Sequence, residues 1–379
     1  MSGNRTDLRG SSPAVVRQAL ETGDPLPGTA GFAGWVDGSL VRGVLGREPL
    51  YVERSVLESE EHPTVEQVAF EPGVLERPRL FPAGSVLRPG SEVERRWDLP
   101  MPAVETGGER VLEAIDAGIT RAVDATDRDD VAVAFSGGVD SALVAARLDA
   151  PLYVAGFPDS HDVEAARTAA DTMGRDLTVV DLEPADLERA VPTVARATGR
   201  TNAMDVQIAL PLYLVAERIA ADGFGAMAVG QGADELFGGY EKVVRLDHRV
   251  TAETVRGAVR EQIETLPDQL PRDVLTIRAA GLTPVAPLLH DAVVEPALSL
   301  PVDWLATETE RKRALRAVAT RYLPESVAMR EKKAVQYGSL VARELDRLAR
   351  QAGYKRRMDD HVSRYISSLL EADADHPTH

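Results

Sequence analysis

Two hydroxyls, two glycines and a carboxylate lie within six consecutive residues and form a candidate phosphate site. The segment reads Ser136-Gly137-Gly138-Val139-Asp140-Ser141. An apolar run, VAVAF, precedes it and a helix-forming segment follows, so the serine hydroxyls lie where free N–H groups at a helix start can bind an anion. The glycines let the backbone bend and approach a ligand closely, and Asp140 adds an oxygen ligand for Mg²⁺. The alternative is a glycine turn capped by serine, but the strand–turn–helix setting favours the phosphate site.

This segment is not the usual phosphate loop, G-x-x-x-x-G-K-[ST], because that loop ends in a lysine. No lysine precedes Lys242 in the chain. The pattern S-G-G-x-D-S instead resembles the pyrophosphate loop of the ATP pyrophosphatase superfamily. The resemblance implies that ATP is split between its α and β phosphates while the glycine turn holds pyrophosphate. The tRNA-thiolating branch of that superfamily relies on cysteine and is excluded, since the chain has none.

A second polar segment, VGQGADELFGGY (229–240), also follows an apolar run. It resembles the second signature of asparagine synthetases, usually G-E-G-x-D-E-x-F-G-G-Y. The resemblance implies that Val229 and Gly230 help to bind ATP and that Asp234 is a second Mg²⁺ ligand beside Asp140. Glu235 and Gln231 become candidates for orienting an amine, although the family carries glutamate at the position of Gln231. β-Lactam synthetases, relatives with the same fold, also lack that glutamate.

Three further segments bear on this resemblance. VAGFPDSHDVEAARTAA (154–170) is similar to the family loop that receives adenine, with backbone at Ala155 and Gly156. Residues 315–339 resemble the segment that ends in a catalytic lysine, which by position is Lys332, with Lys333 beside it. The family motif E-x-R-x-P-[FL]-L-D appears as TPVAPLLH at 283–290, without its charged residues. We expect the apolar residues of this segment to pack as in the family, and we expect no polar role for the segment.

The elements that position these residues alternate between strands and helices. Continuous apolar runs predict strands at 131–135, 151–157, 177–182 and 226–230, with helices between them. Such strands indicate an α/β fold with a doubly wound parallel sheet covered on both faces. The resemblance implies the adenine nucleotide alpha hydrolase-like version of that fold, with C-terminal helices and a small β-rich domain before it.

The rest of the sequence predicts how the domains follow one another along the chain. From the N-terminus, we expect a flexible segment (1–28), a β-rich domain (29–98), a linker (99–108), the synthetase-like ATP pyrophosphatase domain (109–369) and a disordered tail (370–379). The β-rich part resembles the later strands of the family's glutaminase domain. Its first part, with the N-terminal cysteine, is missing, so thioester hydrolysis of glutamine is not expected.

The amino-acid composition and the net charge exclude several classes of function. The 379 residues carry a net charge of −17, only five lysines and no cysteine. Disulfides and thiolate chemistry are therefore excluded, and no basic stripe for nucleic acid is visible. Acidic excess with scarce lysine suits a protein kept in concentrated salt, or alternatively an ordinary acidic protein from a GC-rich genome. No secretory signal or membrane span is evident, so we expect a cytoplasmic protein.

Taken together, the resemblance implies an ATP- and Mg²⁺-dependent amide ligase that converts aspartate to asparagine with ammonia. Two alternatives stay open, namely an amide or lactam synthetase for another carboxylic acid and a non-catalytic nucleotide-binding descendant. The expected partners are a small carboxylate and an amine, with a separate glutaminase or a second copy of the chain as possible protein partners.

Overall fold

A computed structural model describes residues 7–59, 62–126, 128–307, 309–330 and 339–375. The chain forms two compact units. The first consists of Met1–Asp127, Gly230–Val274 and Ala286–Tyr322, and the second of Arg128–Val229, Leu275–Val285 and Leu323–His379. These units group the chain differently from the domains expected from the sequence, because two segments beyond residue 229 pack with the N-terminal part. The domain boundaries expected from the sequence stay a prediction.

The second unit contains the predicted parallel sheet. Its strands, in spatial order, are β10 (Leu177–Asp181), β9 (Leu152–Gly156), β8 (Val131–Ala134), β11 (Ala226–Ala228) and β12 (Thr283–Val285). Every neighbouring pair is parallel. The sequence analysis missed β12, since it is only three residues long and contains a proline.

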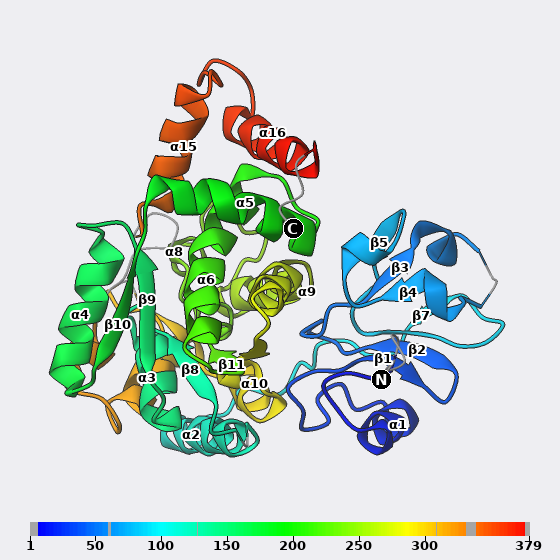
Figure 1. The fold of residues 1–379 in the computed structure, drawn as a ribbon. Coiled ribbons are helices and arrows are strands. Elements are labelled where there is room, and N and C mark those ends of the chain that lie inside the picture. Colours follow the sequence, from blue (N-terminus) through cyan, green and yellow to red (C-terminus); the bar gives the residue numbers. More distant parts are fainter. Residues whose placement is uncertain (1–6, 60–61, 127, 308, 331–338, 376–379) are drawn as a thin grey trace. The chain divides into compact units, whose positions relative to one another are not determined.

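Helices cover both faces of this sheet, which explains why its central strands are continuous apolar runs. Figure 1 shows α4 (His161–Met173) and α6 (Ala203–Ala221) on opposite sides of β9. The other helices that begin in this unit are α3 (Val139–Leu148), α5 (Pro184–Thr198), α13 (Glu325–Ala328), α15 (Val341–Gln351) and α16 (His361–Asp375). The doubly wound α/β fold is thus confirmed.

The strand order reverses between β8 and β11. From β8 the chain moves outward to β9 and β10, and then returns to add β11 and β12 on the other side. Open α/β sheets bind ligands at the carboxyl ends of the strands where this reversal occurs. Ser136 follows β8 and Val229 follows β11, so both candidate segments leave the sheet at its reversal point.

The first unit contains two antiparallel sheets, as expected for a β-rich N-terminal region. One has the order β1 (Ala33–Val36), β2 (Ser39–Arg42), β6 (Ser85–Leu87), β7 (Val93–Arg95), and the other β4 (Val68–Ala69), β3 (Tyr51–Glu53), β5 (Pro78–Leu80). Short 3-10 turns accompany them: η1 (Arg54–Leu57), η2 (Val65–Gln67) and η3 (Pro72–Val74). Leu40, Leu50 and Phe81 are completely buried in their shared core.

Helices complete the first unit. They are α1 (Pro13–Thr22), α2 (Gly108–Asp124), α7 (Ala233–Leu236), α8 (Glu241–Val244), η4 (Pro287–Leu289), α10 (Asp291–Leu298), α11 (Val302–Leu305) and α12 (Arg313–Ala319). Helix α9 (Val255–Ala279) begins in this unit and ends in the other. Within the described ranges, no helix combines the length and apolarity that a membrane span requires.

Helices occupy part of both predicted terminal segments, within residues 7–28 and 370–375. Helix α1 lies inside the predicted flexible segment, capped by the Ser12 hydroxyl and started by Pro13. Its apolar face buries Val16 and Ala19. Helix α16 continues to Asp375, into the predicted disordered tail, and packs against α5. Both predictions are wrong for these helical residues, because tertiary packing outweighs their polar composition.

Candidate active site

The turn after β8 is held together by its two serines. The hydroxyl of Ser141 accepts the N–H of Ser136 at 3.2 Å, contacts Ser136 Oγ at 3.2 Å and donates to the Gly138 carbonyl at 3.2 Å. Gly138 begins α3 without a capping side chain, and Val139 and Asp140 form its first turn. The N–H groups at this helix start therefore remain suited to an anion.

Gly137 is required at its position for two reasons. Its φ of +71° lies in the left-handed region, and a Cβ there would come within 2.6 Å of the Ala165 carbonyl oxygen in α4. The same oxygen accepts a hydrogen bond from the Arg330 guanidinium at 2.8 Å. Gly138 has an ordinary φ of −82°, so backbone conformation does not explain its identity.

The proposed adenine residues, Ala155 and Gly156, end strand β9. A Cβ on Gly156 would lie 2.6 Å from Ser160 Oγ and 2.8 Å from Val163 Cγ2, so α4 begins directly against this backbone. The Gly156 carbonyl accepts the Leu182 N–H at 3.1 Å. The next residue, Phe157, donates its N–H to the Ser339 carbonyl at 3.4 Å.

The two lysines proposed from the sequence, Lys332 and Lys333, lie outside the described residues. The described residues on either side of them are anchored within the second unit. Arg330 contacts the carbonyl that faces Gly137, and Ser339 contacts the end of β9. Arg330 and Ser339 are therefore both tied to the part of the unit that holds the Ser136–Ser141 turn.

The segment after β11 carries an ion pair that the sequence analysis did not identify. Lys312 Nζ lies 2.8 Å from Asp234 Oδ1. A Cβ on Gly239 would lie 1.9 Å from that oxygen and 2.5 Å from Lys312 Cε, so only glycine leaves room for the pair. The scarcity of lysine was the signal that could have drawn attention to Lys312.

Glu235 is the neighbour of Asp234 in the chain and lies in the interior. Its side chain is buried, and its Oε1 accepts the Tyr240 hydroxyl at 2.5 Å. Burial raises the pKa of Glu235, and the nearby Asp234 carboxylate adds to the rise. Burial and the two carboxylates also raise the pKa of Tyr240. This arrangement favours a structural hydrogen bond over the amine-orienting role predicted for Glu235.

Gln231 takes part in a separate set of hydrogen bonds. Its Nε2 donates to Oδ2 of Asp273, which is 8% exposed. Arg272 donates to Asp273 Oδ1 at 2.6 Å and to Oδ2 at 3.0 Å. No sequence pattern pointed to Arg272 or Asp273, which lie in the C-terminal half of α9.

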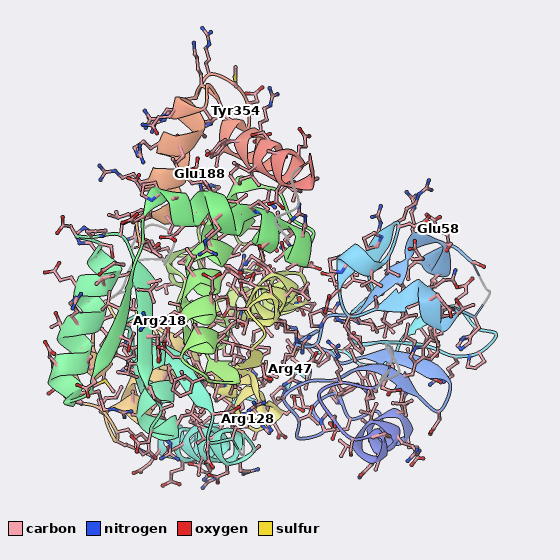
Figure 2. The ribbon with its side chains drawn as sticks, in the orientation of Figure 1. Arg47, Glu58, Arg128, Glu188, Arg218 and Tyr354 are labelled. Atoms are coloured by element: carbon pink, nitrogen blue, oxygen red, sulfur yellow. The ribbon has the colours of Figure 1, made fainter. Side chains whose placement is uncertain are left out.

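The segment 283–290 keeps a polar role, contrary to the prediction that only packing survives there. His290 Nδ1 accepts the Ala292 N–H at 3.1 Å and caps α10, and burial lowers the pKa of His290. Asp291 is 1% exposed and pairs with Arg47, labelled in Figure 2, at 2.5 Å. Removing one partner of a buried pair costs about 3–5 kcal/mol. Polar contacts are therefore present both at His290, within the segment, and at the next residue, Asp291.

The proposed Mg²⁺ ligands belong to different units, Asp140 to the second and Asp234 to the first. Asp140 is half-buried in the first turn of α3, and the Asp234 side chain is 45% exposed. Among the described residues no group of three or more His, Asp or Glu side chains forms a metal cluster. Mg²⁺ is commonly held by one or two carboxylates together with phosphates and water, so each of these carboxylates, taken by itself, is a donor of the kind that fits the ion.

Comparison with known proteins agrees with the sequence signatures. The sequence profile of the asparagine synthase family matches residues 114–265 and 251–374. A putative glutamine-hydrolysing asparagine synthetase of Methanocaldococcus jannaschii is 30% identical over 266 residues, which are 60% of this chain and 49% of the relative. Asparagine synthetase B of Escherichia coli is 25% identical over 183 residues, 48% of this chain and 33% of the relative. The alignments span about half or less of the relatives' length.

The solved structures that match in part include NMN synthetase from Francisella tularensis and an NH₃-dependent NAD synthetase from Campylobacter jejuni. The first has a TM-score of 0.31 at 11% identity, and the second 0.29 at 12%. Each alignment covers 73% of this chain and 98% of the other. The family match begins at residue 114, so the resemblance of residues 29–98 to a glutaminase domain stays a prediction. Because the profile of the asparagine synthase family matches more than half of the chain, this chain belongs to that family.

Proposed function

We propose that this chain is an ATP-dependent amide ligase that activates the side-chain carboxylate of aspartate and transfers it to ammonia. The observation that carries the proposal is the Ser136–Ser141 turn at the reversal point of the sheet. Its glycine backbone and uncapped helix start are suited to pyrophosphate, and Gly137 is fixed there by the approach of α4. Membership of the asparagine synthase family supports the reaction class.

In the first step an oxygen of the carboxylate attacks the α-phosphorus of ATP. The bond between the α-phosphorus and the bridging oxygen breaks, and pyrophosphate leaves with the electron pair. The serine turn would hold the leaving pyrophosphate with helix N–H groups and hydroxyls. A preorganised contact to developing charge contributes about 10²- to 10³-fold in rate.

Asp140 and Asp234 are the residues that would hold Mg²⁺, which neutralises phosphate charge when bound. Asp234 Oδ1 is already engaged by Lys312, so Oδ2 is the oxygen suited to the ion. We assign a second positive charge to Lys332, with Lys333 as its neighbour. The anchoring of Arg330 and Ser339 near the serine turn and β9 supports that assignment.

In the second step the lone pair of the amine attacks the acyl carbon, AMP leaves with the C–O electron pair, and the nitrogen loses a proton. We assign the binding of the amine to Gln231. Glu235 stays in the proposal as a support for this segment through Tyr240. The adenine would lie against the backbone of Ala155 and Gly156, and we assign to Val229 and Gly230 a part in binding ATP.

A second candidate substrate is another carboxylic acid, used in amide or lactam formation. Two observations favour it: glutamine at position 231, and the loss of charged residues at 283–289. A nucleotide-binding protein without catalysis is the third candidate.

Two further points belong to the proposal. The protein partner would be a separate glutaminase or a second copy of the chain, and the acidic composition would suit a cell that grows in concentrated salt.

The deciding experiment is exchange of labelled pyrophosphate into ATP by the purified chain, in high salt, with a panel of carboxylic acids. Exchange with aspartate alone supports the first candidate, and exchange with another acid the second. Asp140→Asn serves as the inactive control. If no acid supports exchange while ATP still binds, the ligase proposal is wrong and the binding protein remains.

A further inference from the structure

We propose that Asp273 and Arg272 are positioning residues which fix the Gln231 side-chain amide with its oxygen toward the reacting amine. The inference rests on the proposed function. It adds that the second substrate is recognised as a hydrogen-bond donor by an uncharged acceptor. Asp273 lies in α9, and its carboxylate is shared between two donors, Gln231 and Arg272.

An ionised carboxylate accepts hydrogen bonds and cannot donate them. Asp273 is 8% exposed, and Arg272 donates to both of its oxygens, so the ionised form is matched by a cation. Gln231 can therefore approach Asp273 only with its NH₂ group. Placing the Gln231 oxygen there would set two acceptors against each other in a buried site, which is unfavourable.

The opposite end of the amide is then fixed as well. Because Nε2 donates to Asp273, Oε1 faces the other way, and in the described part of the chain it has no hydrogen-bond partner. Gln231 is half-buried and follows β11 by three residues. Oε1 is thus an acceptor presented from the start of the segment 230–240.

An acceptor of this kind selects among the substrates. It binds the N–H groups of ammonia or of another amine, and it repels a carboxylate or phosphate oxygen. Glutamine is uncharged, so it accepts a hydrogen bond without the desolvation cost of a second carboxylate beside Asp273. We infer that this segment binds the nucleophile of the second step and has no part in binding the acid.

The test is Asp273→Asn, which keeps the shape of the side chain but allows it to donate as well as accept. The amide of Gln231 is then no longer held in one orientation. We expect the KM for ammonium to rise about five- to tenfold relative to the KM values for ATP and for the acid, as for the loss of one hydrogen bond. The matched control is Asp268→Asn, at an exposed position of the same helix, which should match the wild type.

A second readout does not depend on turnover. In protein labelled with ¹⁵N in glutamine side chains, the signal lost in Gln231→Leu identifies the Gln231 amide. The hydrogen that it donates to Asp273 should exchange slowly in the wild type and in Asp268→Asn, and quickly in Asp273→Asn. Fast exchange in the wild type would overturn the proposed orientation.

The kinetic outcomes separate the two proposals. If Asp273→Asn lowers pyrophosphate exchange and amide formation equally, Asp273 is merely structural and the inference is wrong. If the variant matches the wild type in every KM, the inference is also wrong. If the wild type itself shows no exchange with any acid, the proposed function fails and the amine role with it, while the amide signal still decides the orientation.

Discussion

Lys312 Nζ lies 2.8 Å from Asp234 Oδ1, and the missing side chain of Gly239 makes room for that contact. The two partners differ in their surroundings. The Lys312 side chain is 10% exposed and the Asp234 side chain is 45% exposed. The ion pair therefore neutralises a cation that burial disfavours, while the carboxylate keeps access to solvent and to a ligand.

This difference predicts unequal effects of the two neutral substitutions. Asp234→Asn takes the carboxylate away from a mostly buried ammonium and should lower the free energy of unfolding by about 1–3 kcal/mol. Lys312→Met leaves an accessible carboxylate, so its loss of stability should be smaller. Urea unfolding at neutral pH measures both, with Asp303→Asn, an exposed carboxylate of α11, as the control. Equal losses would contradict the argument.

The same geometry makes Gly239 sensitive to the smallest substitution. In Gly239→Ala the new methyl group would overlap Asp234 Oδ1, which lies 1.9 Å from the Cβ position. We expect a loss of about 1–3 kcal/mol, as for overpacking in a core, together with a loss of amide formation. Gly107→Ala is a suitable control, because the nearest atom to its Cβ position is 3.4 Å away. A Gly239→Ala variant as stable as this control would show that the pair relaxes freely.

The sequence predicted the parallel sheet and its main helices well, because strands buried on both faces are continuous apolar runs. It also located the Ser136–Ser141 turn, since glycines and hydroxyls between a strand and a helix have few other uses. It missed β12, whose three residues carry too little periodicity. It also missed α1, where a cap and a packed face decide the structure.

The site was predictable only where residues are close together in the chain. Tyr240 and Glu235 lie within one motif, from which the sequence singled out Glu235. Lys312 reaches Asp234 across 78 positions, and Asp273 reaches Gln231 across 42. Such pairs depend on tertiary contacts that no local pattern encodes. For the same reason the ion pair of Asp291, directly after the segment 283–290, was missed, since Arg47 is distant from Asp291 in sequence.

The buried Glu235 predicts a specific pH dependence of stability. Burial raises its pKa in the folded protein, whereas the unfolded chain releases this proton near the ordinary value of about 4.3. Above that value the folded state binds more protons than the unfolded state, so this residue lowers the free energy of unfolding as pH rises. Glu235→Gln keeps an acceptor for Tyr240 and removes the titration.

The measurement is urea unfolding of the wild type and Glu235→Gln between pH 4 and 8. The stability of the variant minus that of the wild type should increase with pH and level off once pH exceeds the raised pKa. A constant difference across this range would mean that Glu235 titrates like a solvated carboxylate.

The lysine pair outside the described residues gives a kinetic prediction. If Lys332 stabilises charge in the adenylation transition state, Lys332→Met should lower kcat strongly and change the KM for ATP less. Lys333→Met should have the milder effect. Steady-state kinetics with ATP as the varied substrate would distinguish the two, and the reverse ranking would assign the role to Lys333.

The source of nitrogen is the last prediction. Glutaminases of the related synthetases use a cysteine thiolate to form a thioester, and this sequence contains no cysteine. The isolated chain should therefore form an amide with ammonium and none with glutamine, most strongly at alkaline pH, where free NH₃ is abundant. If the net charge of −17 reflects growth in concentrated salt, the folded state should also require high salt, because screening removes the repulsion among its carboxylates. Product analysis with ¹⁵N-ammonium and with amide-¹⁵N-glutamine, each at low and high salt, tests both points. Glutamate release by the purified chain alone would contradict the nitrogen prediction, because without a thiol the sequence offers no route to that thioester.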